Sequence, residues 1–190
     1  EMIESIRKYG GFYIGRYELS KAGVQKNQPT LTYRDWYGLY NACKDTKLHA
    51  SDKVKTGMIW GCQWDVTMNW LISSGAKTSD EVNEDSSSWG NYSSTSVKAN
   101  DGTTEIKASG KIAVLNTGVT TYTMANNIYD LAGNCFEWTQ EANGSCRANR
   151  GGSCNAGGAP SSNYRGYNTH PDSSTLSYRR YSSNFNNKVG

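Results

Sequence analysis

The sequence predicts an α+β fold with two helices, short strands and much irregular loop. Three observations lead to this prediction. Two stretches carry apolar residues at helical spacing, short runs of β-forming residues lie beside glycines, and long segments are rich in Ser, Asn, Gly and Thr. A chain of 190 residues is long enough to bury a sizeable core, so we predict a single domain over residues 1–190.

The first half of the chain predicts one strand and one helix. Residues 10–18 alternate β-forming residues between glycines and predict a strand. Thr32 and Asp35 have the Ser/Thr-x-x-acid spacing that begins many helices. The apolar residues that follow at helical spacing are Trp36, Leu39, Tyr40 and Cys43.

A second helix is predicted over residues 62–74, with Gly75 as its end. Its apolar face is expected to consist of Trp64, Met68 and Leu71. Residues 80–110 are poor in apolar residues and predict a long surface excursion with little regular structure. The tryptophans expected in or beside the core are Trp36, Trp60, Trp64, Trp70 and Trp138.

The five cysteines do not form a metal-binding or redox pattern. No CxxC pair and no zinc-like Cys/His spacing occurs, and an odd number of thiols cannot all pair within one chain. Buried reduced thiols are the favoured interpretation, and one disulfide between Cys146 and Cys154 remains an alternative. The acids at 35, 65, 130 and 137 have no spacing that favours acid–base catalysis.

Composition excludes several classes of protein. Aromatic residues make up 12% of the chain, so it is not a disordered polymer. No long apolar run is present, which argues against membrane insertion. Residues 146–190 carry five Arg and one Lys against the single acid Asp172, a basic character milder than nucleic-acid binders show. We therefore expect no nucleic-acid partner.

Two motifs in the second half resemble a known family. Residues 128–134 are bounded by turn signals and lead into a predicted strand over 135–139, reading Tyr-Asp-Leu-Ala-Gly-Asn-Cys-Phe-Glu-Trp-Thr from residue 129. Arg-Gly-Gly-Ser follows at 150–153. Together with the opening Gly-Gly-Phe-Tyr-Ile-Gly-Arg-Tyr-Glu, these strings resemble the formylglycine-generating enzymes. The resemblance implies a C-type-lectin-like fold with two helices and small antiparallel sheets.

The same resemblance argues against catalysis. Oxidase members of the family use cysteines at the third and eighth positions after the Ser of Gly-Gly-Ser, which are Ala156 and Ser161 here. Without those thiols the site cannot be built, so we expect no enzyme activity and no cofactor. A divergent oxidase with a relocated thiol site is the alternative. In some relatives, Gly133, Asn134 and Glu137 would hold calcium, while internal pairing of these side chains is the favoured interpretation.

The composition of residues 155–184 predicts a ligand-binding surface. This segment is rich in Asn, Ser, Tyr, Gly and Arg and contains no Lys, Glu, Gln, Trp or Met. Randomising adenines in AAC-type codons reaches the residue types present and cannot produce Lys, Glu, Gln, Trp or Met. The pattern resembles the variable proteins of diversity-generating retroelements, which also use C-type-lectin-like folds.

This resemblance implies a protein or cell-surface ligand, recognised at a cell or virion surface. Tyr, Ser, Gly, Asn and Arg are also the residues favoured in antibody binding sites. Because Leu176 is the only aliphatic residue larger than Ala in the segment, most of its side chains should face solvent on one surface. The predicted contact residues are Asn155, Ser162, Asn163, Tyr164, Tyr167, Asn168, Ser177, Tyr178, Arg180 and Tyr181.

Overall fold

The computed structural model describes residues 2–45 and 56–171, which form a mixed α+β arrangement. The helices are α1 (Met2–Tyr9), α2 (Trp36–Asp45), α3 (Gly61–Ser73) and α4 (Ser79–Asn83), with a 3-10 turn at Thr121–Thr123. The strands are β1 (Val97–Lys98), β2 (Glu105–Lys107), β3 (Met124–Ala125), β4 (Ile128–Tyr129), β5 (Glu137–Asn143), β6 (Cys146–Arg150) and β7 (Arg165–Thr169). The α+β prediction is confirmed, but the prediction of two helices is wrong, because the described residues form four α-helices. None of the helices in the described ranges is long and apolar enough to cross a membrane.

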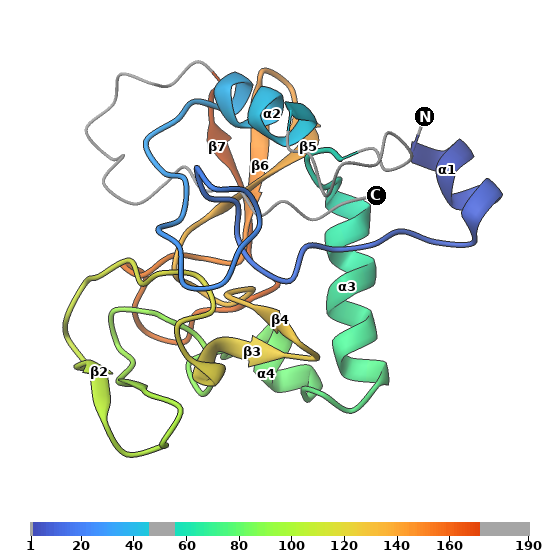
Figure 1. Ribbon diagram of the computed structural model, residues 1–190. Coiled ribbons are helices and arrows are strands. Elements are labelled where there is room, and N and C mark those ends of the chain that lie inside the picture. Colours follow the sequence, from blue (N-terminus) through green and yellow to red (C-terminus); the bar gives the residue numbers. More distant parts are fainter. Residues whose placement is uncertain (1, 46–55, 172–190) are drawn as a thin grey trace.

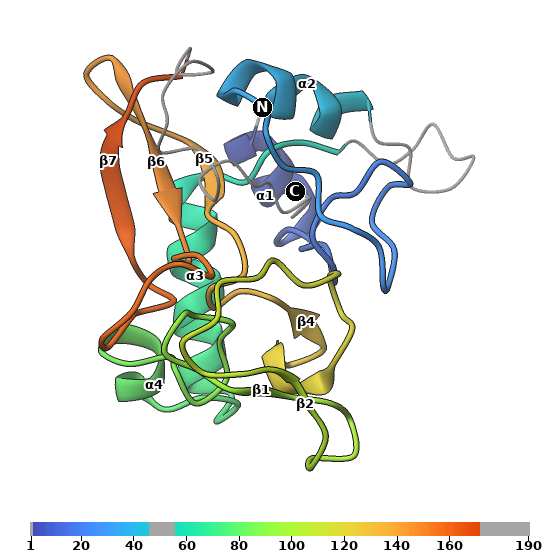
Figure 2. The same ribbon diagram turned by 90° about the vertical axis from the view of Figure 1, so that its left-hand side faces the viewer.

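The strands pair into three small antiparallel sheets. β1 pairs with β2 and β3 with β4, while β5, β6 and β7 form the largest sheet in that order. In its register, Arg150 of β6 faces Glu137 of β5 on one side and Arg165 of β7 on the other. Figures 1 and 2 show α2 near one end of this sheet, while α3 extends away from it toward α4 and the β3–β4 hairpin.

Helix α3 begins and ends one residue earlier than predicted, and the apolar face predicted for it is buried. Trp64, Met68 and Leu71 are each at most 1% exposed. The prediction is wrong for Trp60 and Trp70, which are 37% and 44% exposed. Each helical residue turns about 100°, so Trp70 cannot face the core together with its neighbour Leu71. Trp60 precedes the helix and lies outside its buried stripe.

The start of helix α2 differs from the prediction. The Thr32 motif does not begin the helix, which starts at Trp36. Asp35 caps it instead, because its Oδ1 accepts a hydrogen bond from the Gly38 amide at 2.6 Å. Tyr33 has a φ of 59°, a left-handed conformation that interrupts any helix before this point.

The interior contains two apolar clusters. The first gathers around α3, α4 and the β3–β4 hairpin and includes Trp64, Met68 and Trp89. The second packs α2 against β5 and includes Trp36 and Trp138, which are buried as predicted. The contact between α2 and β5 is reinforced by the Trp36 indole N–H, which donates to the carbonyl of Thr139 at 2.8 Å.

Residues 10–18 do not form the predicted strand. They lack the ladder of main-chain hydrogen bonds that a sheet needs, although their β-forming residues favour an extended chain. The segment is attached instead at Arg16, whose carbonyl accepts from the Tyr129 amide at 2.9 Å. Stacking of Tyr17 on Tyr129, with ring centroids 5.1 Å apart, adds a second contact.

Residues 80–110 are more structured than predicted. They contribute most of helix α4, strands β1 and β2, and the buried side chains of Trp89, Tyr92 and Val97. Lys107 is also buried, and its ammonium donates to the carbonyls of Tyr92 at 2.8 Å and Thr95 at 2.6 Å. Three core side chains spread among polar neighbours give no periodic signal, so composition alone misassigned this segment.

The predicted strand over 135–139 is displaced by two residues, because β5 begins at Glu137. All five cysteines are free in the described structure, so the alternative of a Cys146–Cys154 disulfide is wrong. Cys43, Cys135 and Cys154 are buried, as the favoured interpretation expects, whereas Cys62 is exposed and Cys146 is half-buried.

Candidate ligand-binding surface

The first part of the predicted binding segment is fixed to the scaffold by main-chain hydrogen bonds. Between residues 155 and 171 the segment supplies backbone groups to partners on α2, α4 and the loop before β1. The bonds join Ser93 N to Ala156 O (2.9 Å), Ser86 N to Pro160 O (2.7 Å), Asn163 N to Val82 O (3.1 Å) and Trp36 N to Pro171 O (3.2 Å). Since these bonds use no side chain of the segment, they do not depend on which residues stand at its exposed positions.

The structure exposes some of the predicted contact residues and buries one. Asn155 is exposed, Tyr164 is 41% exposed, and Asn163 and Tyr167 are half-buried. The side chain of Asn168 lies outside the described part of the structure, and so do the four remaining predictions, Ser177, Tyr178, Arg180 and Tyr181. The prediction that most of the segment faces solvent on one surface can therefore be examined only up to residue 171.

Ser162 was wrongly predicted as a contact residue, because it is fully buried. Its amide donates to Ser86 Oγ at 2.8 Å, and its hydroxyl donates to the carbonyl of Val82 at 3.2 Å. Its own carbonyl accepts from the Trp64 indole at 3.2 Å. Because Ser162 is small and its polar groups are hydrogen-bonded, it fits into the interior. Its neighbours in the sequence have a similar composition, so composition gave no sign of its burial.

A polar network joins β7 to the scaffold beneath the surface. Asp65 of α3 binds two arginines, with Oδ1 2.5 Å from Nη2 of the buried Arg150 and Oδ2 against Nη2 of Arg165. Glu141 of β5 forms an ion pair with Nε of Arg165 at 3.4 Å and accepts a hydrogen bond from the hydroxyl of Tyr167. Arg165 and Tyr167 are two residues apart on β7, so both side chains point to the same face and meet these carboxylates.

Asn163 extends this network toward α4. Its Oδ1 accepts from Nη2 of Arg150 at 2.8 Å, and its Nδ2 donates to Oδ1 of Asn83 at 2.9 Å. Sequence reasoning missed Asp65, Glu141 and Arg150 as members of the site. Asp65 gave the one local signal, because it is an acid between Trp64 and Val66 in an otherwise apolar stretch.

The charges of the network shift its pKa values in physically distinct ways. Burial lowers the pKa of Arg150, against the opposing attraction of Asp65. Burial also acts to lower the pKa of Arg165, but the carboxylates of Asp65 and Glu141 outweigh it and the pKa is raised. The hydrogen bond to Glu141 raises the pKa of Tyr167. At neutral pH, both arginines are therefore protonated and Tyr167 is neutral.

Tyr164 lies across β7 with one side open to solvent. Its ring is 5.7 Å from that of Phe136, in a tilted arrangement typical of aromatic pairs. A Cβ added at Gly166 would lie 2.8 Å from the Tyr164 hydroxyl and 2.5 Å from Asn149 Oδ1. The absence of a side chain at Gly166 therefore lets the Tyr164 ring rest against the strand.

The residues at the family's cysteine positions do not contain thiols. Ala156 and Ser161 are half-buried, and the Ser161 hydroxyl donates to the carbonyl of Val82 at 2.9 Å. Cys154 is the nearest thiol in sequence, but burial raises its pKa to about 11. Burial also raises the pKa of Cys135 well above its ordinary value. Both thiols are protonated at neutral pH, which disfavours nucleophilic or metal-binding chemistry.

The positions that would bind calcium in relatives are buried among protein partners. Asn134 is fully buried, and its Nδ2 donates to Glu18 Oε2 at 2.8 Å while its Oδ1 accepts from Asn91 Nδ2 at 2.8 Å. Glu137 is also fully buried. Within residues 2–45 and 56–171, no group of three His, Cys, Asp or Glu side chains is arranged to hold a metal ion.

Glu18 is a buried acid near this motif, and its pKa is strongly raised. It is fully buried, and Thr30 Oγ1 and Asn134 Nδ2 both donate to its Oε2. Its Oε1 has no hydrogen-bond partner among the residues that the structure describes. Burial and the nearby charge of Asp130 raise its pKa well above the ordinary value. The folded protein thus favours the protonated acid, and the resulting stability is complete below about pH 4.3 and declines as the pH rises toward the raised pKa.

We predict that Glu18→Gln stabilises the protein at pH 8 but has little effect at pH 4. Glutamine keeps the oxygen that accepts both hydrogen bonds and removes the charge that burial opposes. Urea denaturation at both pH values measures the difference, and Glu84→Gln at an exposed position is the control. An equal effect of Glu18→Gln at both pH values would contradict the prediction.

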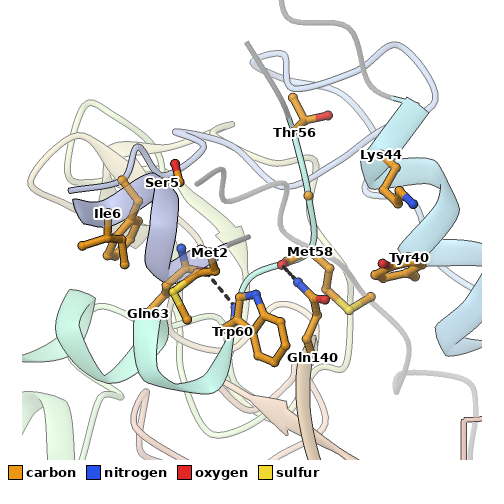
Figure 3. A pocket seen from close by; sticks show the side chains of 12 residues that line it. Met2, Ser5, Ile6, Tyr40, Lys44, Thr56, Met58, Trp60, Gln63 and Gln140 are labelled. Atoms are coloured by element: carbon orange, nitrogen blue, oxygen red, sulfur yellow. Dashed lines mark hydrogen bonds between the residues drawn. The ribbon is translucent and has the colours of Figure 1, made fainter. Parts of the chain in front are cut away.

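A separate cavity of about 240 Å³ lies between α1, α2 and the start of α3. Figure 3 shows Met2, Ser5 and Ile6 of α1 on one side and Tyr40 and Lys44 of α2 on the other, with Trp60 between them. Gln140 Nε2 donates to the carbonyl of Met58 at 2.6 Å at its base. Thr56 and Gly57 also line it.

Comparison with known proteins adds no relative. Neither a scan of protein-family models nor a search of curated proteins finds a match to this chain. The fold and the arrangement of the binding segment therefore carry the functional argument.

Proposed function

We propose that this chain is a ligand-binding protein with a C-type-lectin-like fold of the formylglycine-generating enzyme type. In this proposal, residues 155–184 are diversified by a retroelement and contact a protein or cell-surface ligand. One observation carries the proposal: main-chain hydrogen bonds fix the backbone of the segment while Asn155 and Tyr164 remain exposed. Exposed side chains on such a backbone can change without altering the path of the chain, which a diversified surface requires.

The exposed chemistry suits protein recognition. Tyr164 offers a rigid aromatic surface with a polar end, and its contact with Phe136 reduces the freedom that binding would remove. Arg165 lies beside it with both of its carboxylate partners, so its position is also restrained. A preformed aromatic and arginine surface resembles the residues that dominate the binding energy of protein interfaces.

The proposal is that of a binding protein without enzyme activity. Its support is the presence of Ala156 and Ser161 at the cysteine positions, together with the raised pKa values of the buried thiols. The purified protein should not oxidise a cysteine-containing peptide in the presence of copper. Turnover of such a peptide would contradict this part of the proposal and favour the oxidase alternative.

We predict that the exposed positions tolerate diversification and that the buried position does not. The double variant Asn155→Ala/Tyr164→Ser should change the free energy of unfolding by no more than about 0.5 kcal/mol, as exposed substitutions usually do. Ser162→Tyr should destabilise by about 1–3 kcal/mol or more, because it overfills a packed interior and removes the hydrogen bond from the Ser162 hydroxyl to the carbonyl of Val82.

The same contrast can be measured in two displayed libraries. One randomises positions 155 and 164 with codons that keep a pyrimidine in the third position, and the other randomises 162 and 166 in the same way. Resistance to protease on the cell surface reports folding. Most members of the first library should resist cleavage and most of the second should not. Equal loss in both libraries would show that the exposed residues are structural.

The genetic part of the proposal has its own test. The DNA beside the gene should encode a reverse transcriptase and contain a near-copy of the coding region for residues 155–184. Absence of both from the complete genome would contradict diversification by a retroelement. The proposal of ligand binding would then depend on the result of the library experiment.

A further inference from the structure

An apolar groove lies along α3, and none of residues 155–171 lines it. It has a volume of about 520 Å³, within the range of small-molecule sites. Its walls are α3, residues 11–16 and the turn between β3 and β4. Figure 1 shows the N-terminal segment leaving α1 and crossing α3 to form one of these walls.

Large apolar side chains line the groove and remain exposed. Trp70 is 44% exposed and Val66 is 55% exposed, and their spacing of four residues places them together on α3. Tyr13 on the opposite wall is 86% exposed. Aromatic and branched side chains gathered in a concave region are typical of a ligand site, whereas isolated exposed apolar residues are common on any surface.

One cation stands at the groove with no ion-pair partner among the described residues. Arg16 is exposed, lines the groove and makes no ion pair with any described residue. It is the only charged side chain among the described lining residues. Asn127, also exposed in the lining, offers an amide at the hairpin turn. An unpaired guanidinium beside an apolar floor complements a ligand that joins an apolar body to a carboxylate.

We infer that this groove binds a small aromatic carboxylic acid. The aromatic ring of the ligand lies on Trp70 and Val66, Tyr13 covers it from the other wall, and the carboxylate pairs with Arg16. The volume of about 520 Å³ lies within the range of small-molecule sites and favours a small molecule over a folded partner. This inference does not depend on the function proposed for residues 155–184.

The experiment uses phenylbutyrate as the probe and phenylbutanol as its neutral counterpart. Titration of the isotope-labelled chain, followed by amide chemical shifts, gives affinity and location together. Phenylbutyrate should bind saturably, with shifts confined to residues 11–16, 66–70 and 126–128. Arg16→Gln should weaken it about tenfold, consistent with loss of a charge-assisted hydrogen bond, and leave phenylbutanol unchanged. Arg34→Gln, at an exposed arginine elsewhere, is the matched control and should have no effect.

A second pair of variants tests the apolar floor. Trp70→Ala should abolish saturable binding, whereas Trp60→Ala, at an exposed tryptophan in the other cavity, should preserve it. Well-dispersed amide spectra show that each variant is folded. Equal affinity for the acid and the alcohol, or shifts centred elsewhere, would overturn the inference. A concentration-dependent dimer that Trp70→Ala abolishes would also overturn it, because a second copy would then cover the groove.

Discussion

Replacing Asn134 with Ala should lower the free energy of unfolding by about 3 kcal/mol and the Tm by roughly 6–12 °C. Asn134 is fully buried and makes four side-chain hydrogen bonds. Its Oδ1 accepts from Asn91 Nδ2 and from the Leu115 amide at 2.9 Å, while its Nδ2 donates to Glu18 and to the Leu115 carbonyl. Alanine leaves a partly buried amide at Leu115 without its acceptor and removes a donor from Glu18.

Backbone conformation adds to this cost. Asn134 has a φ of 57°, in the left-handed region that asparagine tolerates better than alanine. Urea denaturation at neutral pH measures the loss. Asn69→Ala, at an exposed position of α3, is the control and should change stability by less than about 0.5 kcal/mol. An equally small effect of Asn134→Ala would show that the network contributes little.

Asn134→Asp separates hydrogen bonding from shape. Aspartate has nearly the same size, but an oxygen replaces Nδ2 and faces Oε2 of Glu18. Two acids that share a buried site cannot both ionise cheaply. We expect this variant to be less stable than Asn134→Ala at pH 8 and to recover part of its stability at pH 5, when one acid is protonated.

The sequence predicted those elements whose signal is local. Helix α3 was predicted because Trp64, Met68 and Leu71 recur at helical spacing, and the structure buries all three. Helix α4 was missed although its signal was also local. Thr78 and Glu81 form a capping box, with Thr78 N 2.8 Å from Glu81 Oε2, in a segment judged by composition as loop.

Other features could not be predicted because they depend on distant parts of the chain. The extended segment before Arg16 has strand-like residues, but whether it joins a sheet depends on a partner that no local pattern specifies. The burial of Trp89 likewise depends on α3 and the β3–β4 hairpin packing around it. Its indole N–H donates to the carbonyl of Glu81 at 3.1 Å, a contact visible only after folding.

The candidate site shows the same division. Composition identified residues 155–184 as unusual, and the exposure of Asn155 and Tyr164 agrees with that interpretation. Composition could not distinguish Ser162, which is chemically like its exposed neighbours but lies against α4. Nor could it find Asp65 and Glu141, which come from other elements and meet Arg165 only through the arrangement of α3, β5 and β7.

Gly133→Ala should be at least as damaging as the Asn134 variant, with a loss of about 3 kcal/mol or more. Gly133 has a φ of 73°, and an added Cβ would lie 2.4 Å from the carbonyl oxygen of Asn91. That backbone cannot move aside, because the Asn91 amide donates to Ala132 O at 3.1 Å and its carbonyl accepts from the Asn134 amide at 2.8 Å. The added methyl group would therefore push apart the segments around Asn91 and Gly133, which are joined at these two residues by a parallel β-bridge.

Gly102→Ala distinguishes the two sources of this cost. Gly102 has the same φ of 73°, but nothing lies within 4 Å of its added Cβ. Its alanine variant should lose only the conformational part, about 1–2 kcal/mol. Urea denaturation of both variants measures the difference, which is the steric cost of pushing Asn91 away from Gly133. Equal losses would mean that the Asn91 backbone shifts freely and that the contact between Asn91 and Gly133 is not rigid.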